Sequence, residues 1–209
     1  MRDEVLVIAC GAVARELAEL KRTFGWRHLR LKCLDARLHN TPDAIPQAVE
    51  EAIREHASRF EHVFVAYADC GTGGRLDRVL EAHDVERLPG AHCYEFLAGP
   101  RRFAALAEAE PGTFYLTDFL ARNFDRLVIR PLGLDANPEL RDAYFGNYRR
   151  LVYLSQSLDA TLVDAARAAA EWLELAFEHV HCGLDELESA MAERVLRWGG
   201  DQEDFRLLA

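Results

Sequence analysis

The hydrophobic pattern of the chain opens with a continuous apolar run that predicts a buried strand. Val5 to Ala9 (VLVIA) and, later, Val63 to Ala68 (VFVAYA) contain no charged residue, which is typical of strands buried on both faces of a sheet. Between them, His28 to Cys33 (HLRLKC) alternates apolar and basic positions, as a half-buried strand nearer the edge would. Val85 to Leu88 predicts a short fourth strand, which a proline–glycine pair ends.

Helices are predicted after the first three of these strands, because apolar residues recur there at intervals of three or four. They fall at Val13, Leu17 and Leu20, at Ile45, Val49 and Ile53, and at Leu76, Val79 and Leu80. Thr41 and Pro42 supply an N-cap and a first-turn proline for the second helix. The alternation indicates an α/β fold, a mostly parallel sheet with helices on both faces.

The second half of the chain is predicted to be richer in helix. Helical spacing occurs over residues 103–109, 119–127, 138–145, 147–154, 159–172 and 185–198. A single strand is predicted in this half, over Leu173 to Val180. Since no repeat, low-complexity tract or linker divides the sequence, we predict one domain over residues 1–209.

Composition narrows the range of partners. Half of the 209 residues are hydrophobic, which is enough for one substantial core. The formal charge is −10, from 35 acidic and 25 basic residues, the opposite of what binding to a phosphate backbone requires. The first apolar run is too short for a signal peptide, and no run approaches the roughly 18 residues that span a membrane. We therefore expect a cytoplasmic protein that binds neither nucleic acid nor membrane.

Three of the five cysteines fall after predicted strands. Cys10 follows the first strand, Cys70 the third and Cys93 the short fourth. The carboxyl ends of parallel strands meet at one edge of the sheet, where open α/β folds bind their ligands, so these three thiols are expected to converge. An odd number of cysteines in a chain without a signal peptide argues against a disulfide framework.

Convergent thiolates suit a metal ion. Zinc accepts cysteine and histidine ligands, and a fourth position left open makes it a Lewis acid. A [4Fe–4S] cluster with one iron that lacks a cysteine is the second possibility. We predict a metal site formed by Cys10, Cys70 and Cys93, with His39 in the segment LHNTP or His92 as a further ligand. Buried structural thiols and a lone nucleophile are the alternatives.

A small-molecule pocket is predicted from two polar segments. In DCGTGG, the backbone amides of Gly71, Gly73 and Gly74 precede a helix and are predicted to stabilise the anionic part of a small substrate. The segment lacks both the Walker pattern and GxGxxG, which disfavours ATP and NAD. A tight turn without a ligand is the alternative. Asn147 and Tyr148, in YFGNYRRLVYL, are further pocket candidates, with ordinary aromatic core as the alternative.

Cysteine catalysis without a metal is the main rival hypothesis. Cys70 before a helix would have a lowered pKa, and His39 or His92 would be its base. Asp69 and Glu95 are predicted catalytic groups that orient this histidine or protonate a leaving group. A single nucleophile leaves the other two converging cysteines unexplained, so this hypothesis ranks second.

Several motifs together resemble one bacterial and archaeal family catalogued as a domain of unknown function. They are CGA at Cys10, LHNTP, YADCGTGG, PGAHCYEF, FYLTDF and YFGNYRRLVYL. The resemblance covers Val5 to about Leu154, and DCGTGG and HCYEF are its most specific segments. Members of that family are often found beside corrinoid proteins and methyltransferases of the trimethylamine type. The resemblance therefore implies a setting, one-carbon or methyl-group metabolism, without a proven reaction.

Within that setting, we expect a metal-binding protein that activates a thiol or a small anionic substrate. A zinc ion lowers the pKa of a bound thiol and so prepares a thiolate to accept a methyl group. The expected partners are a small-molecule substrate and a corrinoid protein or methyltransferase that presents its corrinoid. Two alternatives remain: an accessory protein that carries metal or corrinoid without catalysis of its own, and a metal-free hydrolase or transferase that uses Cys70.

Overall fold

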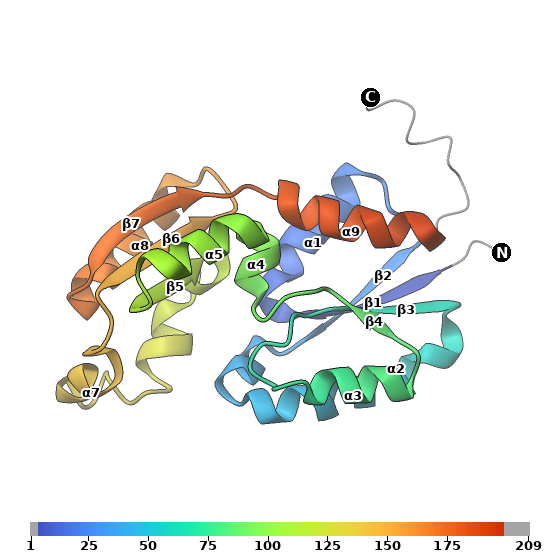
Figure 1. Ribbon diagram of the computed structural model, residues 1–209, viewed down its shortest axis with the longest axis horizontal. Helices are drawn as coiled ribbons and strands as arrows, with labels where there is room; N and C mark the ends of the chain where they lie inside the picture. The colour runs from blue at the N-terminus through green and yellow to red at the C-terminus, as the bar shows by residue number, and fades with distance from the viewer. Residues whose placement is uncertain (1–3, 199–209) are drawn as a thin grey trace. The chain divides into compact units, whose positions relative to one another are not determined.

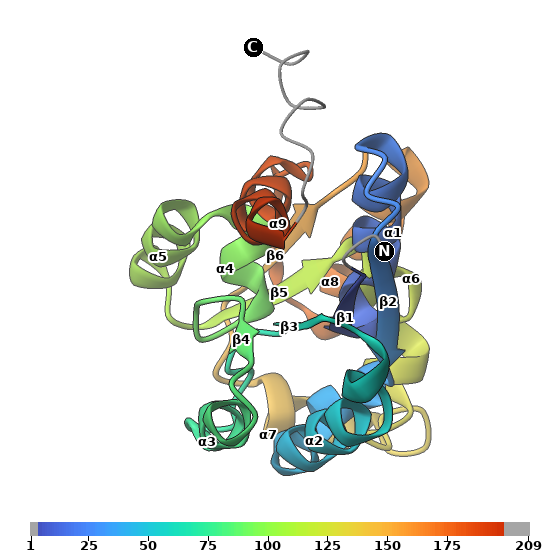
Figure 2. The same cartoon turned by 90° about the vertical axis from the view of Figure 1, so that its right-hand side faces the viewer.

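The computed structural model describes residues 4–198, and they form parallel β-sheets with helices (Figures 1 and 2). The predicted α/β class is therefore confirmed, although the described strands form two sheets where the sequence predicted one. Residues 4–96 with 185–198 make one compact unit, unit 1, and residues 97–184 make the other, unit 2. A domain is defined by folding on its own, which this grouping does not test, so the single domain stays a prediction.

Unit 1 is built around a four-stranded parallel sheet in the order β2-β1-β3-β4. Its strands are β1 (Val5–Cys10), β2 (Leu29–Leu34), β3 (His62–Ala66) and β4 (Glu86–Arg87). All six residues of β1 are buried, as expected for the central strand of a sheet that is covered on both faces. β2 lies at an edge of the sheet as predicted, and Leu29 is its one fully buried residue, but its burial does not alternate as the sequence predicted, since Cys33 is exposed.

Helices cover both faces of this sheet (Figures 1 and 2). The helices of unit 1 are α1 (Ala14–Thr23), α2 (Ile45–His56), α3 (Arg75–Ala82) and α9 (Asp185–Trp198), and α4 (Cys93–Ala98) begins in unit 1 and ends in unit 2. Short 3-10 helices lie at Gly11–Val13, Ala36–Asn40, Pro42–Ala44 and Ala57–Arg59. Helices α2 and α3 lie on one face, and α1 and α9 on the other. Trp198 attaches α9 to β3, since its ring centroid lies 5.3 Å from that of His62 and 5.9 Å from that of Phe64.

Unit 2 contains a three-stranded parallel sheet in the order β5-β6-β7. Its elements are β5 (Thr113–Thr117), β6 (Arg150–Ser155), β7 (Ala176–His181), α5 (Pro100–Ala109), α6 (Asp118–Arg122), α7 (Arg141–Phe145) and α8 (Ala160–Leu173), with a π-helix at Asp125–Ile129 and a 3-10 helix at Pro138–Leu140. Buried alanines of α8, among them Ala166 and Ala170, pack in one core with Leu151 and Tyr153 of β6.

The structure differs from the predictions for the second half in three places. Residues 147–154 were predicted as helix, but residues 150–155 form β6, the central strand of the second sheet. Leu151 to Ser155 are all buried, and a continuous apolar run satisfies helical spacing as easily as strand burial. The strand β5 was not predicted, and the predicted strand at Leu173 to Val180 starts later, at Ala176, because Leu173 still belongs to α8.

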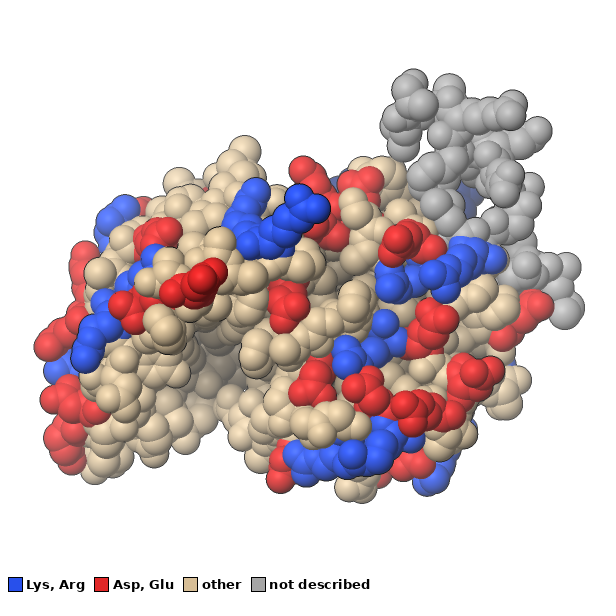
Figure 3. Space-filling view, in the orientation of Figure 1, with Lys and Arg blue, Asp and Glu red and all other residues tan. Residues whose placement is uncertain are grey.

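The surface carries both signs of charge in close mixture. Figure 3 shows acidic and basic side chains interspersed over one face of the described residues. Among the described residues, Arg87 forms an ion pair with Asp77 at 2.6 Å, and Arg150 with Glu178 at 2.5 Å. Within residues 4–198, the helices are all too short or too polar to cross a membrane.

Candidate metal centre

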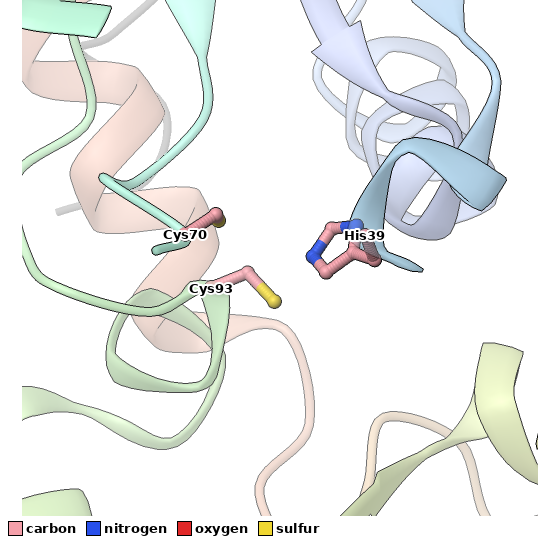
Figure 4. Close-up of side chains that lie close together, drawn as sticks. All are labelled: His39, Cys70 and Cys93. Carbon is pink, nitrogen blue, oxygen red and sulfur yellow. The ribbon is translucent and has the colours of Figure 1, made fainter. Parts of the chain in front are cut away.

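Three potential metal ligands of unit 1 lie together in the structure. Ligand atoms of His39, Cys70 and Cys93 all lie within 4.8 Å of one another (Figure 4). Both cysteines are 7 % exposed, and the histidine is half-buried. All three belong to segments that follow the carboxyl ends of strands, β2 for His39, β3 for Cys70 and β4 for Cys93. This is the edge of the sheet at which the sequence placed a ligand site.

Two backbone hydrogen bonds hold the cysteine loops against each other. The amide of Asp69 donates to the carbonyl of Gly90 at 3.1 Å, and the amide of Cys70 donates to the carbonyl of Ala91 at 2.8 Å. The second bond joins Cys70 to a residue only two positions before Cys93. Cys70 itself has a φ of 50°, in the left-handed region that residues other than glycine rarely adopt. The chain therefore turns sharply where its thiol is presented.

Two carboxylates fix these loops. Asp69 accepts hydrogen bonds from the amides of Gly73 (3.0 Å) and Gly74 (2.8 Å) and from the hydroxyl of Thr72 (2.6 Å). Burial raises the pKa of Asp69, but these hydrogen bonds outweigh it and lower the pKa to about 2. Of the three glycine amides that were predicted to bind a substrate anion, those of Gly73 and Gly74 thus bind the Asp69 carboxylate.

Glu95 of α4 has the same role for the loop that precedes Cys93. Its carboxylate accepts hydrogen bonds from the amides of Ala91 (2.7 Å) and His92 (3.2 Å). Gly90 has a φ of +104°, and a Cβ built on it would lie 2.9 Å from the Glu95 carboxylate. The carboxylates of Asp69 and Glu95 therefore both bind backbone of the loops that carry the cysteines, and their predicted catalytic role stays a prediction.

His39 lies on the short helix Ala36–Asn40, which Asp35 caps by accepting the Arg37 amide at 2.9 Å. Its Nδ1 atom lies 3.5 Å from the sulfur of Cys10. Figure 4 shows the other ring nitrogen, Nε2, directed toward Cys70 and Cys93. One nitrogen of the ring thus contacts Cys10, and the second faces the thiols of Cys70 and Cys93.

Cys10 lies next to the cluster but outside the group of three. As the last residue of β1 it is buried, and its sulfur accepts the amide of Ala12 at 3.4 Å. The following residue, Gly11, allows close packing, because a Cβ there would meet the carbonyl of Leu34 at 2.6 Å. The geometry makes Cys10 a neighbour of the histidine, whereas the sequence predicted it as a direct ligand.

The charges of the cluster are strongly coupled. Burial lowers the pKa of His39, but hydrogen bonds to Cys10 and Cys70 outweigh it and raise the pKa to about 10. A hydrogen bond with Cys93 is the main reason that the pKa of Cys70 falls to about 5, against burial, which raises it. The same bond, together with burial, raises the pKa of Cys93. At neutral pH one thiolate thus pairs with an imidazolium.

Sequence reasoning missed Tyr67, which follows β3. The side chain is 1 % exposed, and its hydroxyl makes no hydrogen bond to any residue within 4–198. The last paired residues of β1 and β3 are Ala9 and Ala66, so the register places Tyr67 beside Cys10. A polar group within the apolar run VFVAYA was the signal that could have identified it.

Other predicted site residues lie outside the cluster. The His92 side chain is exposed, and its ring centroid lies 6.4 Å from that of Tyr94. Gly71 lies in the Cys70 loop with a φ of 85°. Asn147 and Tyr148 belong to unit 2, where the Tyr148 ring packs edge-on against Phe114 with a centroid separation of 5.7 Å. Their predicted ligand-binding roles stay predictions.

The donor set of the cluster is one that zinc accepts. Two thiolates and one imidazole are the protein ligands of a catalytic type of zinc site, which leaves the fourth position open. A single ion binds its sulfurs at about 2.3 Å, so ligand atoms within 4.8 Å of one another reach it after a small contraction. The cysteines of a four-iron cluster bind separate irons and need wider spacing. The observed spacing thus favours one ion.

Comparison with protein families identifies a match. A family model described as "Protein of unknown function (DUF1638)" matches residues 33–191. The matched range contains His39, Cys70 and Cys93 and begins after Cys10. No curated protein matches the chain. Because the family model covers well over half of the sequence, the chain belongs to the DUF1638 family of proteins of unknown function.

Proposed function

We propose that the protein binds one zinc ion through His39, Cys70 and Cys93 and uses the open fourth position to bind a small thiol or other anionic substrate. The observation that carries this proposal is the convergence of the three ligand atoms within 4.8 Å in unit 1. Zinc would lower the pKa of the bound thiol and so supply a thiolate at neutral pH. A [4Fe–4S] cluster is the second choice of cofactor, because the spacing favours a single ion.

The residues around the ligands prepare them for this task. Cys10 contacts Nδ1 of His39, and a hydrogen bond at this nitrogen fixes the ring so that Nε2 faces the metal. Asp69 and Glu95 hold the backbone of the two cysteine loops. The metal ligands are therefore held in position before the ion binds, which reduces the ordering that binding requires.

The resemblance to a family found beside corrinoid systems supplies the setting of the proposal. In that setting the thiolate would accept a methyl group from a corrinoid that a partner protein presents in the cytoplasm. An accessory protein would bind metal or corrinoid without turnover. Incubation of the zinc-loaded protein with a methylated corrinoid and a thiol separates the two, because only an enzyme forms methyl thioether catalytically.

The test of the metal site itself is metal content. The protein is purified without oxygen and without a chelating tag, and zinc, iron and sulfide are measured per chain. About one zinc is expected in the wild type, and loss of most of it in His39→Ala, Cys70→Ala and Cys93→Ala. Cys33→Ala is the matched control, since this thiol is exposed and lies outside the group. Full zinc content in the three site variants would refute the site.

A second function has one observation in its favour. The pKa of Cys70 is lowered to about 5 beside His39, whose pKa is raised to about 10, and such a thiolate–imidazolium pair is the nucleophile of cysteine hydrolases and transferases. This alternative predicts a protein without bound metal in which iodoacetamide modifies Cys70 first. Protection of Cys70 by added zinc would favour the metal site instead.

A further inference from the structure

The Tyr67 hydroxyl is a buried hydrogen-bond donor that the ligand set does not use. The residue is 1 % exposed, and its oxygen has no hydrogen-bond partner among the described residues. Leaving such a group unpaired costs about 1–3 kcal/mol, and buried polar atoms in folded proteins almost always have partners. An unpaired donor beside a cluster of metal-binding side chains therefore indicates a partner that arrives with the ligand.

The strand register places this residue beside Cys10, the thiol that contacts His39. Burial raises the pKa of Tyr67 most, followed by the charge of the Cys10 thiol and its polar contact with the hydroxyl, and then by the charges of Cys70 and Cys33. Cys10 is near enough to act on the hydroxyl, but the contact does not meet the geometry of a hydrogen bond. Its sulfur, a weak acceptor, already accepts the Ala12 amide and contacts His39.

The strand register explains why the position is rigid. Tyr67 continues β3 directly after Ala66, and both Ala66 and Ala68 are fully buried. The loop then turns at Cys70, whose amide is held by Ala91. A buried tyrosine side chain that continues the sheet and lies beside Cys10 can reorient little, so its hydroxyl is a hydrogen-bond donor with a fixed position.

We propose that the Tyr67 hydroxyl donates a hydrogen bond to the coordinating atom of the exogenous ligand in the fourth position, and that this ligand is a small thiol bound as its thiolate. The inference rests on the proposed zinc function and adds the residue that selects the ligand. A thiolate sulfur on a metal still has lone pairs that accept a hydrogen bond, whereas the coordinating nitrogen of a neutral imidazole has none left. The site would therefore prefer thiolate to neutral nitrogen ligands.

Cobalt(II) substituted for zinc provides the test, because its bonds to thiolates absorb in the near ultraviolet. Wild type, Tyr67→Phe and Tyr115→Phe are loaded with cobalt and titrated with 2-mercaptoethanol and, separately, with imidazole. Tyr115→Phe is the matched control, since it removes the hydroxyl of a tyrosine in unit 2. Circular dichroism of each variant verifies that it is folded.

The expected result is that Tyr67→Phe binds cobalt like the wild type and binds 2-mercaptoethanol roughly tenfold more weakly, as for a lost hydrogen bond to a charged acceptor. Its affinity for imidazole should stay unchanged, and the control should match the wild type with both probes. Unchanged thiol binding, or an equal loss for both probes, would overturn the inference. So would a folded Tyr67→Phe that no longer binds cobalt, because the hydroxyl would then serve the protein ligands. A wild type without thiolate–cobalt bands would instead refute the zinc function and the inference with it.

Discussion

At the scale of single residues, the same thiol group has different roles according to its neighbours. Cys70 and Cys93 lie with their sulfurs in the group of three, while Cys10, one strand away, contacts the back of the His39 ring. All are buried and none forms a disulfide. The difference lies in which side of the His39 ring each thiol faces. Cys70 and Cys93 lie on the side of Nε2, whereas Cys10 lies on the side of Nδ1.

Replacement of Cys10 tests this distinction. Cys10→Ala should keep one zinc per chain but bind it roughly 10- to 100-fold more weakly, as expected when a group that orients a ligating histidine is lost. Cys70→Ala should lose the metal under the same conditions. Competition with a chromophoric chelator measures both affinities. If Cys10→Ala loses the ion as completely as Cys70→Ala does, Cys10 is a fourth protein ligand. The zinc then has no open position for a substrate.

The pH dependence of zinc affinity follows from the charges of the free site. Between about pH 6 and pH 8 Cys70 is already a thiolate, with its pKa near 5, whereas His39 (pKa about 10) and Cys93 (pKa raised) still hold their protons. Zinc needs all three deprotonated, so binding should release about two protons and tighten as the pH rises. Calorimetry in buffers of different ionisation enthalpy counts them. Release of no proton would contradict this charge distribution.

At the scale of elements, the loop before α4 is the part of the site that an added side chain would disturb most. Gly90 accepts the Asp69 amide through its carbonyl, and it has a φ of +104° with the Glu95 carboxylate close to its α-carbon. A side chain there must either push Glu95 away from the amides of Ala91 and His92 or move the backbone. In both cases Cys93 shifts relative to Cys70.

Gly90→Ala should therefore reduce both stability and metal affinity. We expect a loss of about 1–3 kcal/mol in the free energy of unfolding from strain at this conformation, and weaker zinc binding as well. Gly25→Ala is the control, since its φ is +64° but no atom lies within 4 Å of an added Cβ. It should cost stability without changing the affinity for zinc. Urea denaturation and zinc competition give the two quantities, and an equal effect of both variants on zinc would count against a role of the Gly90 loop.

Comparison of the individual strands and helices shows how much of the structure the sequence could predict. The buried strands β1 and β3 were predicted because their apolar runs are short and rich in β-branched valine and isoleucine, and the closing helix α9 because its apolar residues recur at helical spacing. β6 was read as helix because four consecutive apolar residues fit either period. For the site, the predicted parallel sheet indicated that the loops after the strands meet at one edge, but the choice of His39 over His92 depends on loop geometry. The place of Tyr67 depends on register, which the sequence alone does not give.

At the scale of the whole molecule, unit 1 is discontinuous. It comprises the chain up to Phe96 and resumes at Asp185 with α9, so the residues of unit 2 are inserted into it. Helix α9 contributes Trp198, whose ring lies against His62 and Phe64 of β3. One face of the first sheet is thus completed by the last helix that the structure describes.

Removal of this contact should destabilise unit 1. Trp198→Ala is expected to lower the free energy of unfolding by about 2 kcal/mol, less than the 3–5 kcal/mol for a fully buried tryptophan, because the side chain is only half-buried. Trp172→Ala, a change to a 38 % exposed tryptophan of unit 2, should cost less. Thermal unfolding followed by circular dichroism compares the two. Equal effects would mean that α9 contributes little to the first sheet.

The insertion has a consequence for synthesis. His39, Cys70 and Cys93 leave the ribosome early, but α9 follows only after the 88 residues of 97–184 have been translated. At about 5–20 residues per second, this takes roughly 4 to 18 seconds. During that time the nascent chain carries its thiols and histidine on a sheet that lacks one covering helix. Zinc that binds in this interval would fasten the loops after β2, β3 and β4 together, and the metal would then act as an assembly aid before it acts as a cofactor.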